Sequence, residues 1–166
     1  MTNTSECAQQ VRTEDLEPQP VLSIRQTVSL ADLPQVQGAS LAALWQFMQR
    51  ETVAAVGPPF VRYHTFGDEE TDVEVGVPTS APAAGDGRIV GGELPGGPAI
   101  TTWHLGSHAT LADAYARLQA WRIDQAREPR DAGWEIYSWI DPAVEPDPQS
   151  WPAPDEWRTR LIQPVV

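Results

Sequence analysis

A chain of 166 residues is long enough to bury the core of one domain, and its formal net charge of −12 makes it strongly acidic. This charge argues against nucleic-acid binding, because a protein needs a basic surface to neutralise the phosphate backbone. The single cysteine, Cys7, excludes an internal disulfide. No apolar run reaches the roughly 18 residues of a membrane span and no signal peptide is recognisable, so we expect a cytoplasmic protein.

The first half of the chain predicts two strands, a helix and two further strands. Residues 11–29 hold two strand-like runs around a turn, which we interpret as a hairpin. Ser29-Leu30-Ala31-Asp32 has the pattern of a helix-capping box. The helix that follows has an apolar stripe made of Leu41, Leu44, Trp45 and Met48. Residues 60–66 and 72–77 then alternate as strands.

The second half repeats this plan. Residues 88–106 predict a second hairpin, and Thr110-Leu111-Ala112-Asp113 is a second capping-box pattern. The second helical stripe consists of Leu111, Ala114, Tyr115, Leu118 and Trp121. Residues 134–140 and 159–163 predict the last two strands. We therefore expect a single α+β domain over 1–166, with half-repeats at about 11–78 and 87–165, pseudo-twofold symmetry, antiparallel sheets and a ligand cleft at the join.

The segment from Gly133 to Pro142 is the most informative part of the chain. It alternates with period two, so Glu135, Tyr137 and Trp139 share one face of a strand. A buried carboxylate is costly unless something pairs with it, and a carboxylate between aromatic rings favours flat, cationic or polarised organic molecules. The alternative is an exposed sheet face on which Glu135 is solvated.

Motifs for other chemistry are absent, so we expect no cofactor and no metal. There is no nucleotide-binding loop, Cys-x-x-Cys pair or His-Glu-x-x-His sequence. His104 and His108 are separated by a strand-to-helix junction, which argues against a shared metal ion. The Pro-rich connection from Pro142 to Trp157 is either a functional loop or an idle connector. Its Trp151 either fills a core pocket or forms a lid over the ligand.

Several runs occur in a specific order along nearly the whole chain. They are Gly57–His64, Asp72–Pro78, Trp103–His108, Ala114-Tyr115, Leu118, Trp121 and Trp134–Tyr137 through Asp141-Pro142. Together they resemble the GyrI-like small-molecule-binding family, which is related to the effector-binding domains of AraC-type and MerR-type multidrug regulators. No helix-turn-helix region accompanies the domain, so we expect a stand-alone member.

The resemblance implies a duplicated fold of two strand-helix-strand-strand modules around a central drug-binding cleft. It implies that Glu135 faces the cleft and meets cationic ligands, that Tyr137 lines the cleft, and that Trp103 adds an aromatic wall. We expect Tyr63 to come from the opposite module. Where the family frequently has Gly-Pro-Tyr, this chain has Gly106-Ser107-His108. The role of His108 is therefore left open.

Binding of hydrophobic, aromatic and often cationic small molecules, such as drugs or xenobiotics, is the function that we favour. Glu135 would supply the charge, while Trp103, Tyr137 and Trp139 would stack on the ligand.

Two alternatives follow from the resemblance. Some stand-alone relatives resemble detoxifying hydrolases that open strained cyclopropane rings of DNA-alkylating natural products. Glu135 would then activate water, and Tyr63, Tyr137 or His108 would donate a hydrogen bond to the oxyanion. The family also includes a DNA gyrase inhibitor, and the negative charge could mimic nucleic acid for a basic partner. The acidic residues are scattered along the chain, which argues against gyrase binding.

Overall fold

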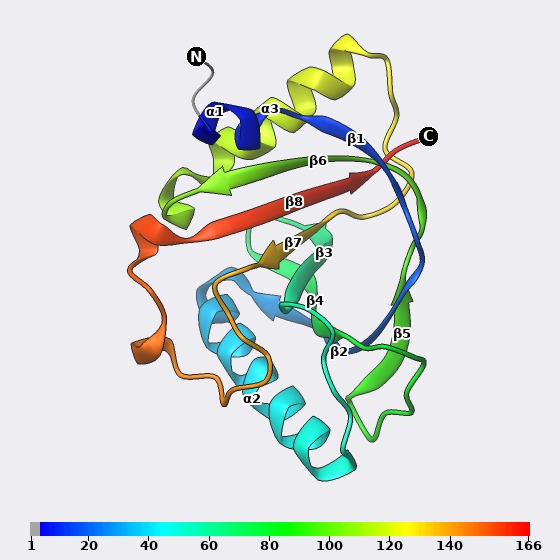
Figure 1. Ribbon diagram of the computed structural model, residues 1–166, viewed down its shortest axis with the longest axis vertical. Helices are drawn as coiled ribbons and strands as arrows, with labels where there is room; N and C mark the ends of the chain where they lie inside the picture. Colours follow the sequence, from blue (N-terminus) through cyan, green and yellow to red (C-terminus); the bar gives the residue numbers. More distant parts are fainter. Residues whose placement is uncertain (1–3) are drawn as a thin grey trace.

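The computed structural model describes residues 4–166. Its eight strands form one antiparallel sheet, and two long helices lie on the outer face of the sheet (Figure 1). The strands are β1 (Arg12–Leu16), β2 (Gln19–Ser29), β3 (Phe60–Phe66), β4 (Glu70–Pro78), β5 (Val90–Leu94), β6 (Gly97–Leu105), β7 (Trp134–Tyr137) and β8 (Arg158–Pro164). The helices are α1 (Thr4–Gln9), α2 (Leu33–Glu51) and α3 (Leu111–Asp124). Short 3-10 turns are η1 (Leu30–Asp32), η2 (His108–Thr110), η3 (Pro148–Ser150) and η4 (Pro154–Glu156). None of the helices in the described part of the chain is long and apolar enough to cross a membrane.

The strand order shows the expected pseudo-twofold symmetry. The order is β1-β6-β8-β7-β3-β4-β2-β5. Replacing each strand by its counterpart in the other half (β1 by β5, β2 by β6, β3 by β7, β4 by β8, and the reverse) gives the same order read from the opposite edge of the sheet. At the centre β3 pairs with β7, and Val61 lies directly opposite Glu135. Tyr63 and Tyr137, two residues further along each strand, therefore occupy equivalent positions.

The two predicted hairpins are wrong, because β1 is not hydrogen-bonded to β2 and β5 is not hydrogen-bonded to β6. β1 pairs with β6, while β2 pairs with β4 and β5. Each short connection is built around a proline, in Glu17-Pro18 and Pro95-Gly96. A tight two-residue hairpin needs a positive φ at its first central residue in types I′ and II′. In Pro95-Gly96 that residue is proline, which cannot adopt a positive φ, and in Glu17-Pro18 it is Glu17, for which a positive φ is unfavourable. The chain instead crosses over, so the two halves exchange their first strands.

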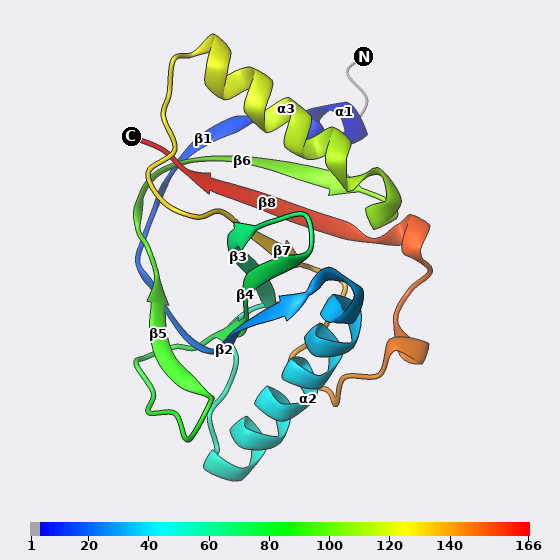
Figure 2. The same cartoon turned by 180° about the vertical axis from the view of Figure 1, so that it is seen from behind.

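The sheet curls into a half-barrel whose edge strands approach each other. Leu16 at the end of β1 and Leu94 at the end of β5 belong to one apolar cluster with Phe60 and Trp134 inside the curl. The helices cover the outer face, and Figure 2 shows them towards opposite ends of the molecule with β3, β4 and β7 between them. The outer face between the two helices is therefore available for a site.

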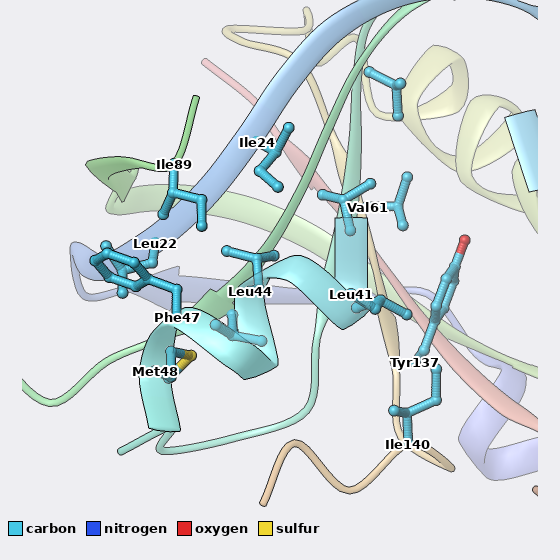
Figure 3. Packing of buried hydrophobic residues seen from close by; sticks show 13 residues of the cluster. Leu22, Ile24, Leu41, Leu44, Phe47, Met48, Val61, Ile89, Tyr137 and Ile140 are labelled. Carbon is cyan, nitrogen blue, oxygen red and sulfur yellow. The ribbon is translucent and has the colours of Figure 1, made fainter. Parts of the chain in front are cut away.

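Helix α2 is attached to the outer face by apolar packing (Figure 3). Its buried apolar residues are Leu41, Leu44, Phe47 and Met48, which pack on Leu22, Ile24 and Val61 of the sheet. The predicted stripe was wrong at one position, since Trp45 is only half-buried and Phe47 fills the core. The other three predicted positions are buried, so the exchange widens and turns the predicted face without replacing it.

Each long helix follows a 3-10 turn that is capped by a serine, but only the first cap is at the predicted position. At the first, the Ser29 hydroxyl accepts a hydrogen bond from the backbone N–H of Asp32 at 3.2 Å, as the sequence pattern predicts. At the second, Thr110 makes no side-chain cap, and Ser107 accepts from the N–H of Ala109 at 3.1 Å instead. The second capping-box prediction was therefore wrong. A 3-10 turn precedes each helix, and in the second half its capping residue is Ser107, three residues before the predicted Thr110.

Candidate functional site

Glu135 lies on the central strand of the sheet. Its backbone is paired on both sides, opposite Val61 of β3 and Leu161 of β8. The side chain projects from the helix-bearing face and is only 2% exposed, so the alternative of a solvated glutamate is wrong. The strand predicted for residues 134–140 is too long: β7 ends at Tyr137, where the N–H of Ile140 donates to the Tyr137 carbonyl at 3.2 Å.

Two tyrosine hydroxyls are the hydrogen-bond partners of the Glu135 carboxylate. Tyr115 on α3 donates to Oε2, and Tyr137 on β7 donates to Oε1 at 2.9 Å. Within residues 4–166, no basic side chain forms an ion pair with Glu135. Burial raises the pKa of Glu135 because a charged carboxylate is poorly solvated there, and the two hydroxyl donors offset part of that rise.

The surrounding tyrosines remain protonated at neutral pH. Burial and the nearby Glu135 charge raise the pKa of Tyr63, Tyr115 and Tyr137. Although 40% of the Tyr115 surface is exposed, its hydroxyl lies against the buried carboxylate. The Tyr63 hydroxyl accepts from Gln37 Nε2 at 3.1 Å. The site thus offers neutral hydroxyl donors around one carboxylate.

A pocket of about 580 Å³ opens over Glu135 between the first turns of the two helices. Its other lining residues are Leu33, Tyr63, Phe66, Leu111, Ala112, Tyr115, Gly133 and Gln163. Glu135 is the one charged residue among the described residues that line it. A mostly apolar concavity with few polar groups is typical of small-molecule sites, whose volumes are about 300–1,000 Å³.

An aromatic cluster continues from Tyr137 beyond this pocket. Tyr137 stacks on Trp139 with ring centroids 4.8 Å apart, and Trp139 stacks on Trp157 at 4.5 Å with an interplanar angle of 2°. His108 lies against all three rings, and its Nε2 is 2.8 Å from the hydroxyl of Thr159. Burial, together with nearby His104, lowers the pKa of His108 to about 4, so His108 is neutral at pH 7.

The structure does not bring Trp103 to this pocket. Ile100 on β6 packs beneath α3, so Trp103, three positions later, projects from the other face of the strand. It lies in a separate hollow beside Cys7 and Glu14, with the Arg158 guanidinium 5.0 Å from its ring centroid. Trp103 therefore does not line the cleft as we expected, because side chains alternate between the two faces of a strand.

Sequence reasoning missed Tyr115 and Phe66. We assigned Tyr115 to the core stripe of the second helix, but its ring lines the pocket and its hydroxyl reaches Glu135. The available signal was the hydroxyl itself, because a tyrosine in an apolar stripe needs a hydrogen-bond partner. Phe66 ends β3 and is 62% exposed. Its place beside the pocket depends on how the strand ends, which the alternation does not indicate.

Trp151 is half-buried and does not line the Glu135 pocket. It packs against the core cluster beneath α2 and also lines a second hollow, beside Trp139 and Trp157. The segment from Pro142 to Trp157 therefore covers the aromatic cluster and not Glu135.

Residues 9–165 match the family model of the GyrI-like small molecule binding domain. The chain belongs to this family. No curated protein matches it in sequence.

Several solved structures share the fold of this GyrI-like domain. The crystal structure of the EcmrR C-terminal domain has a TM-score of 0.78 and 21% identity, with 95% of this chain and 97% of that chain covered. In a cryo-EM structure of an EcmrR–DNA complex, the likeness spans 57% of that chain.

Two further solved structures are similar at lower identity. A hydrolase from Listeria innocua has a TM-score of 0.66 and 11% identity, with 95% and 92% of the two chains covered. SAV2435 bound to tetraphenylphosphonium has a TM-score of 0.59 and 12% identity, with 95% and 94% covered. At these identities the likenesses show the fold alone.

Proposed function

We propose that this GyrI-like domain binds hydrophobic, aromatic and often cationic small molecules, such as drugs or other xenobiotics, over Glu135. One observation carries the proposal: a carboxylate that is 2% exposed, with tyrosine hydroxyls as partners, at the base of a mostly apolar pocket. A buried carboxylate without a counter-ion is costly. A ligand cation would supply the missing positive charge in a place where water screens it poorly.

The aromatic side chains of the pocket suit the same ligands. Tyr63 and Phe66 line it from strand β3 and Tyr115 from helix α3, and aromatic faces attract a cation while tolerating many ring shapes. The similar SAV2435 structure holds tetraphenylphosphonium, a lipophilic cation, which supports this ligand class.

The test compares a cation with a neutral analogue. Isothermal titration with tetraphenylphosphonium and triphenylphosphine oxide should show that Glu135→Gln weakens binding of the cation by roughly tenfold or more, since one desolvated charge contact is lost. Binding of the neutral oxide should change little. The control Glu93→Gln removes an equal charge at an exposed position and should leave both affinities unaltered. Equal losses for both ligands in Glu135→Gln would refute the charge role.

A hydrolase is the second candidate, favoured by the raised pKa of Glu135 beside protonated tyrosines. Glu135 would accept the proton of a water whose oxygen bonds to the strained ring carbon. The breaking carbon–carbon bond would send its electron pair to a conjugated carbonyl oxygen, which Tyr137 would protonate. Each carboxylate oxygen accepts one tyrosine hydroxyl and retains a second lone pair that a water could bond.

Mass spectrometry decides between the two candidates. If the protein is a hydrolase, incubation with a cyclopropane-containing alkylator yields a ring-opened product with the mass of one added water. Glu135→Gln and Tyr137→Phe should abolish that product. An unaltered alkylator, in a protein that still binds tetraphenylphosphonium, would leave binding as the function.

A further inference from the structure

A second hollow, of about 330 Å³, lies beside the Glu135 pocket and shares no lining residue with it. Its walls come from α2, from the turn after β7 and from the segment that ends at Trp157. Tyr137 lines the second hollow, while its hydroxyl bonds to Glu135 in the first. Gln37 lines the second hollow and donates to Tyr63 of the first. The two spaces are therefore adjacent but separate.

Helix α2 contributes an interior glycine to this hollow. Gly38 lines it, and a Cβ atom placed on Gly38 would meet no heavy atom within 4 Å. Glycine inside a helix lowers stability relative to alanine, so a gap maintained by glycine has a cost. Neither close packing nor a left-handed backbone requires Gly38, since its φ is not positive. A larger side chain at Gly38 would extend into the hollow that Gly38 lines.

The lining carries no formal charge at neutral pH. It contains no Asp, Glu or Arg, and its polar side chains are Gln37 and His108, apart from the hydroxyl and indole groups of its aromatic residues. Burial lowers the pKa of His108 to about 4, so His108 is neutral at pH 7. Trp139, Trp151 and Trp157 provide large aromatic surfaces. Such a space favours flat, neutral groups and offers nothing to offset the desolvation of an ion.

Trp139 adds a hydrogen-bond donor that is not satisfied. Its Nε1 atom is buried and has no hydrogen-bond partner among the described residues. Its ring already stacks on Tyr137 and Trp157, so a ligand gains less from stacking on Trp139 than from reaching its N–H edge. An unsatisfied buried N–H destabilises the empty protein, and an acceptor atom on an entering molecule removes that cost.

We propose that this second hollow is a separate binding subsite for a flat, uncharged aromatic ring system that carries a hydrogen-bond acceptor, such as a ketone oxygen. The acceptor takes the N–H of Trp139 after a small shift of the side chains that cover it, and the ring system occupies the space over Gly38. The subsite differs in specificity from the Glu135 pocket and does not depend on the function proposed for that pocket.

The first test fills the space. Equilibrium dialysis at pH 7 with 9-fluorenone should show that Gly38→Leu lowers affinity by on the order of tenfold or more, because the new side chain occupies the hollow. The variant replaces glycine with a better helix former, so it should fold. Ala39→Leu adds the same side chain at an exposed neighbouring position and should bind 9-fluorenone like the wild type. Unchanged affinity in Gly38→Leu would overturn the proposal.

The same variants separate this subsite from the Glu135 pocket. Gly38→Leu should still bind tetraphenylphosphonium if the wild type does, and Glu135→Gln should bind 9-fluorenone with unchanged affinity. A loss of 9-fluorenone binding in Glu135→Gln would place the ketone in the first pocket and refute the second subsite. Failure of tetraphenylphosphonium to bind would refute the cation role without affecting this result.

The second test concerns the acceptor. The wild type should prefer 9-fluorenone over fluorene, which has the same shape without the ketone, by about tenfold. Trp139→Phe should abolish this preference. Trp45→Phe is the matched control, because Trp45 Nε1 is also buried without a partner in the described chain but does not line the hollow. Equal affinity of the wild type for the two probes, or a preference that survives Trp139→Phe, would overturn the proposal.

Discussion

The backbone of Glu135 is fixed by the sheet, and its side-chain partners offset only part of the cost of burying its negative charge. Strands on both sides fix its backbone, and Tyr115 and Tyr137 satisfy its two oxygens. Hydroxyl donors stabilise a buried carboxylate less than a cation does. The buried carboxylate therefore lowers the stability of the protein when no cation is bound.

This cost predicts a pH-dependent gain in stability for Glu135→Gln. Because burial raises the folded-state pKa of Glu135 above its ordinary value of 4.5, its contribution is present below pH 4.5 and is lost as pH rises through the folded-state pKa. The variant should melt at a higher temperature than the wild type at pH 7, by roughly 2–4 °C for each kcal/mol gained. At pH 4 the difference should be small. Calorimetry at both pH values measures it, and a lower melting temperature for the variant at pH 7 would contradict the argument.

His108 predicts the opposite pH trend. Its pKa of about 4 lies below the ordinary 6.5, so the stability that it contributes is present above pH 6.5 and is lost as pH falls towards 4. His108→Gln keeps a group able to bond to Thr159 but removes the titration. Urea unfolding at pH 7 and at pH 4.5 should show a smaller loss of stability in the variant than in the wild type. Parallel losses would show that His108 is not buried in its neutral form.

Residue alternation identified only part of the candidate site. The period-two pattern correctly places Glu135 and Tyr137 on one face, because pleating is a local property of a strand. Tyr115 reaches Glu135 from a helix 20 residues earlier in the chain. Such a contact depends on how α3 packs on the sheet, which periodicity does not encode. The resemblance to the family placed Trp103 at the cleft, whereas the face that Trp103 occupies depends on which side of the sheet α3 covers.

At the scale of elements, the segment between β7 and β8 contacts both the hydrophobic core and the second hollow. Pro148, Trp151 and Trp157 line the second hollow, and Trp151 also packs against the core beneath α2. Prolines restrict the backbone of this segment although it makes few regular hydrogen bonds. The segment is therefore a preformed cover more than a flexible connector.

Replacing Trp151 with alanine should affect both roles of the segment. We expect weaker binding of 9-fluorenone by the scale of one aromatic contact, about 0.5–1.5 kcal/mol, and a lower melting temperature. Tetraphenylphosphonium binding should be unchanged, because Trp151 does not line the Glu135 pocket. Val144→Ala, at a 56% exposed position of the same segment, is the control and should change neither property. Dialysis and thermal unfolding make the comparison; a loss confined to tetraphenylphosphonium would contradict this assignment.

Most elements could be predicted from the sequence, but their pairing could not. The strand at Phe60–Phe66 has its predicted bounds, since alternation and flanking prolines define it locally. The hairpins failed because strand partners are chosen by the whole sheet. In the Glu17-Pro18 connection, a tight hairpin turn would require a positive φ at Glu17, which residues other than glycine rarely adopt.

At the scale of the whole molecule, strand exchange makes each half depend on the other. β1 of the first half pairs with β6, and β5 of the second half pairs with β2. The cluster inside the curl combines Phe60 of the first half with Trp134 of the second, so neither half can bury its own apolar face. The Glu135 pocket is likewise composite, because Tyr63 comes from one half and Tyr115 from the other.

This dependence predicts that the two halves fold only together. Fragments 1–80 and 81–166, divided at an exposed position of the connecting loop, should each lack a cooperative unfolding transition. An equimolar mixture should recover one transition by near-ultraviolet circular dichroism and should bind tetraphenylphosphonium, since both halves of the pocket are then present. A first fragment that begins at Gln19 lacks β1 and should complement much more weakly, because the edge of β6 stays unpaired. If either fragment unfolded cooperatively alone, the exchanged strands would be dispensable, and the symmetry would describe two independent modules.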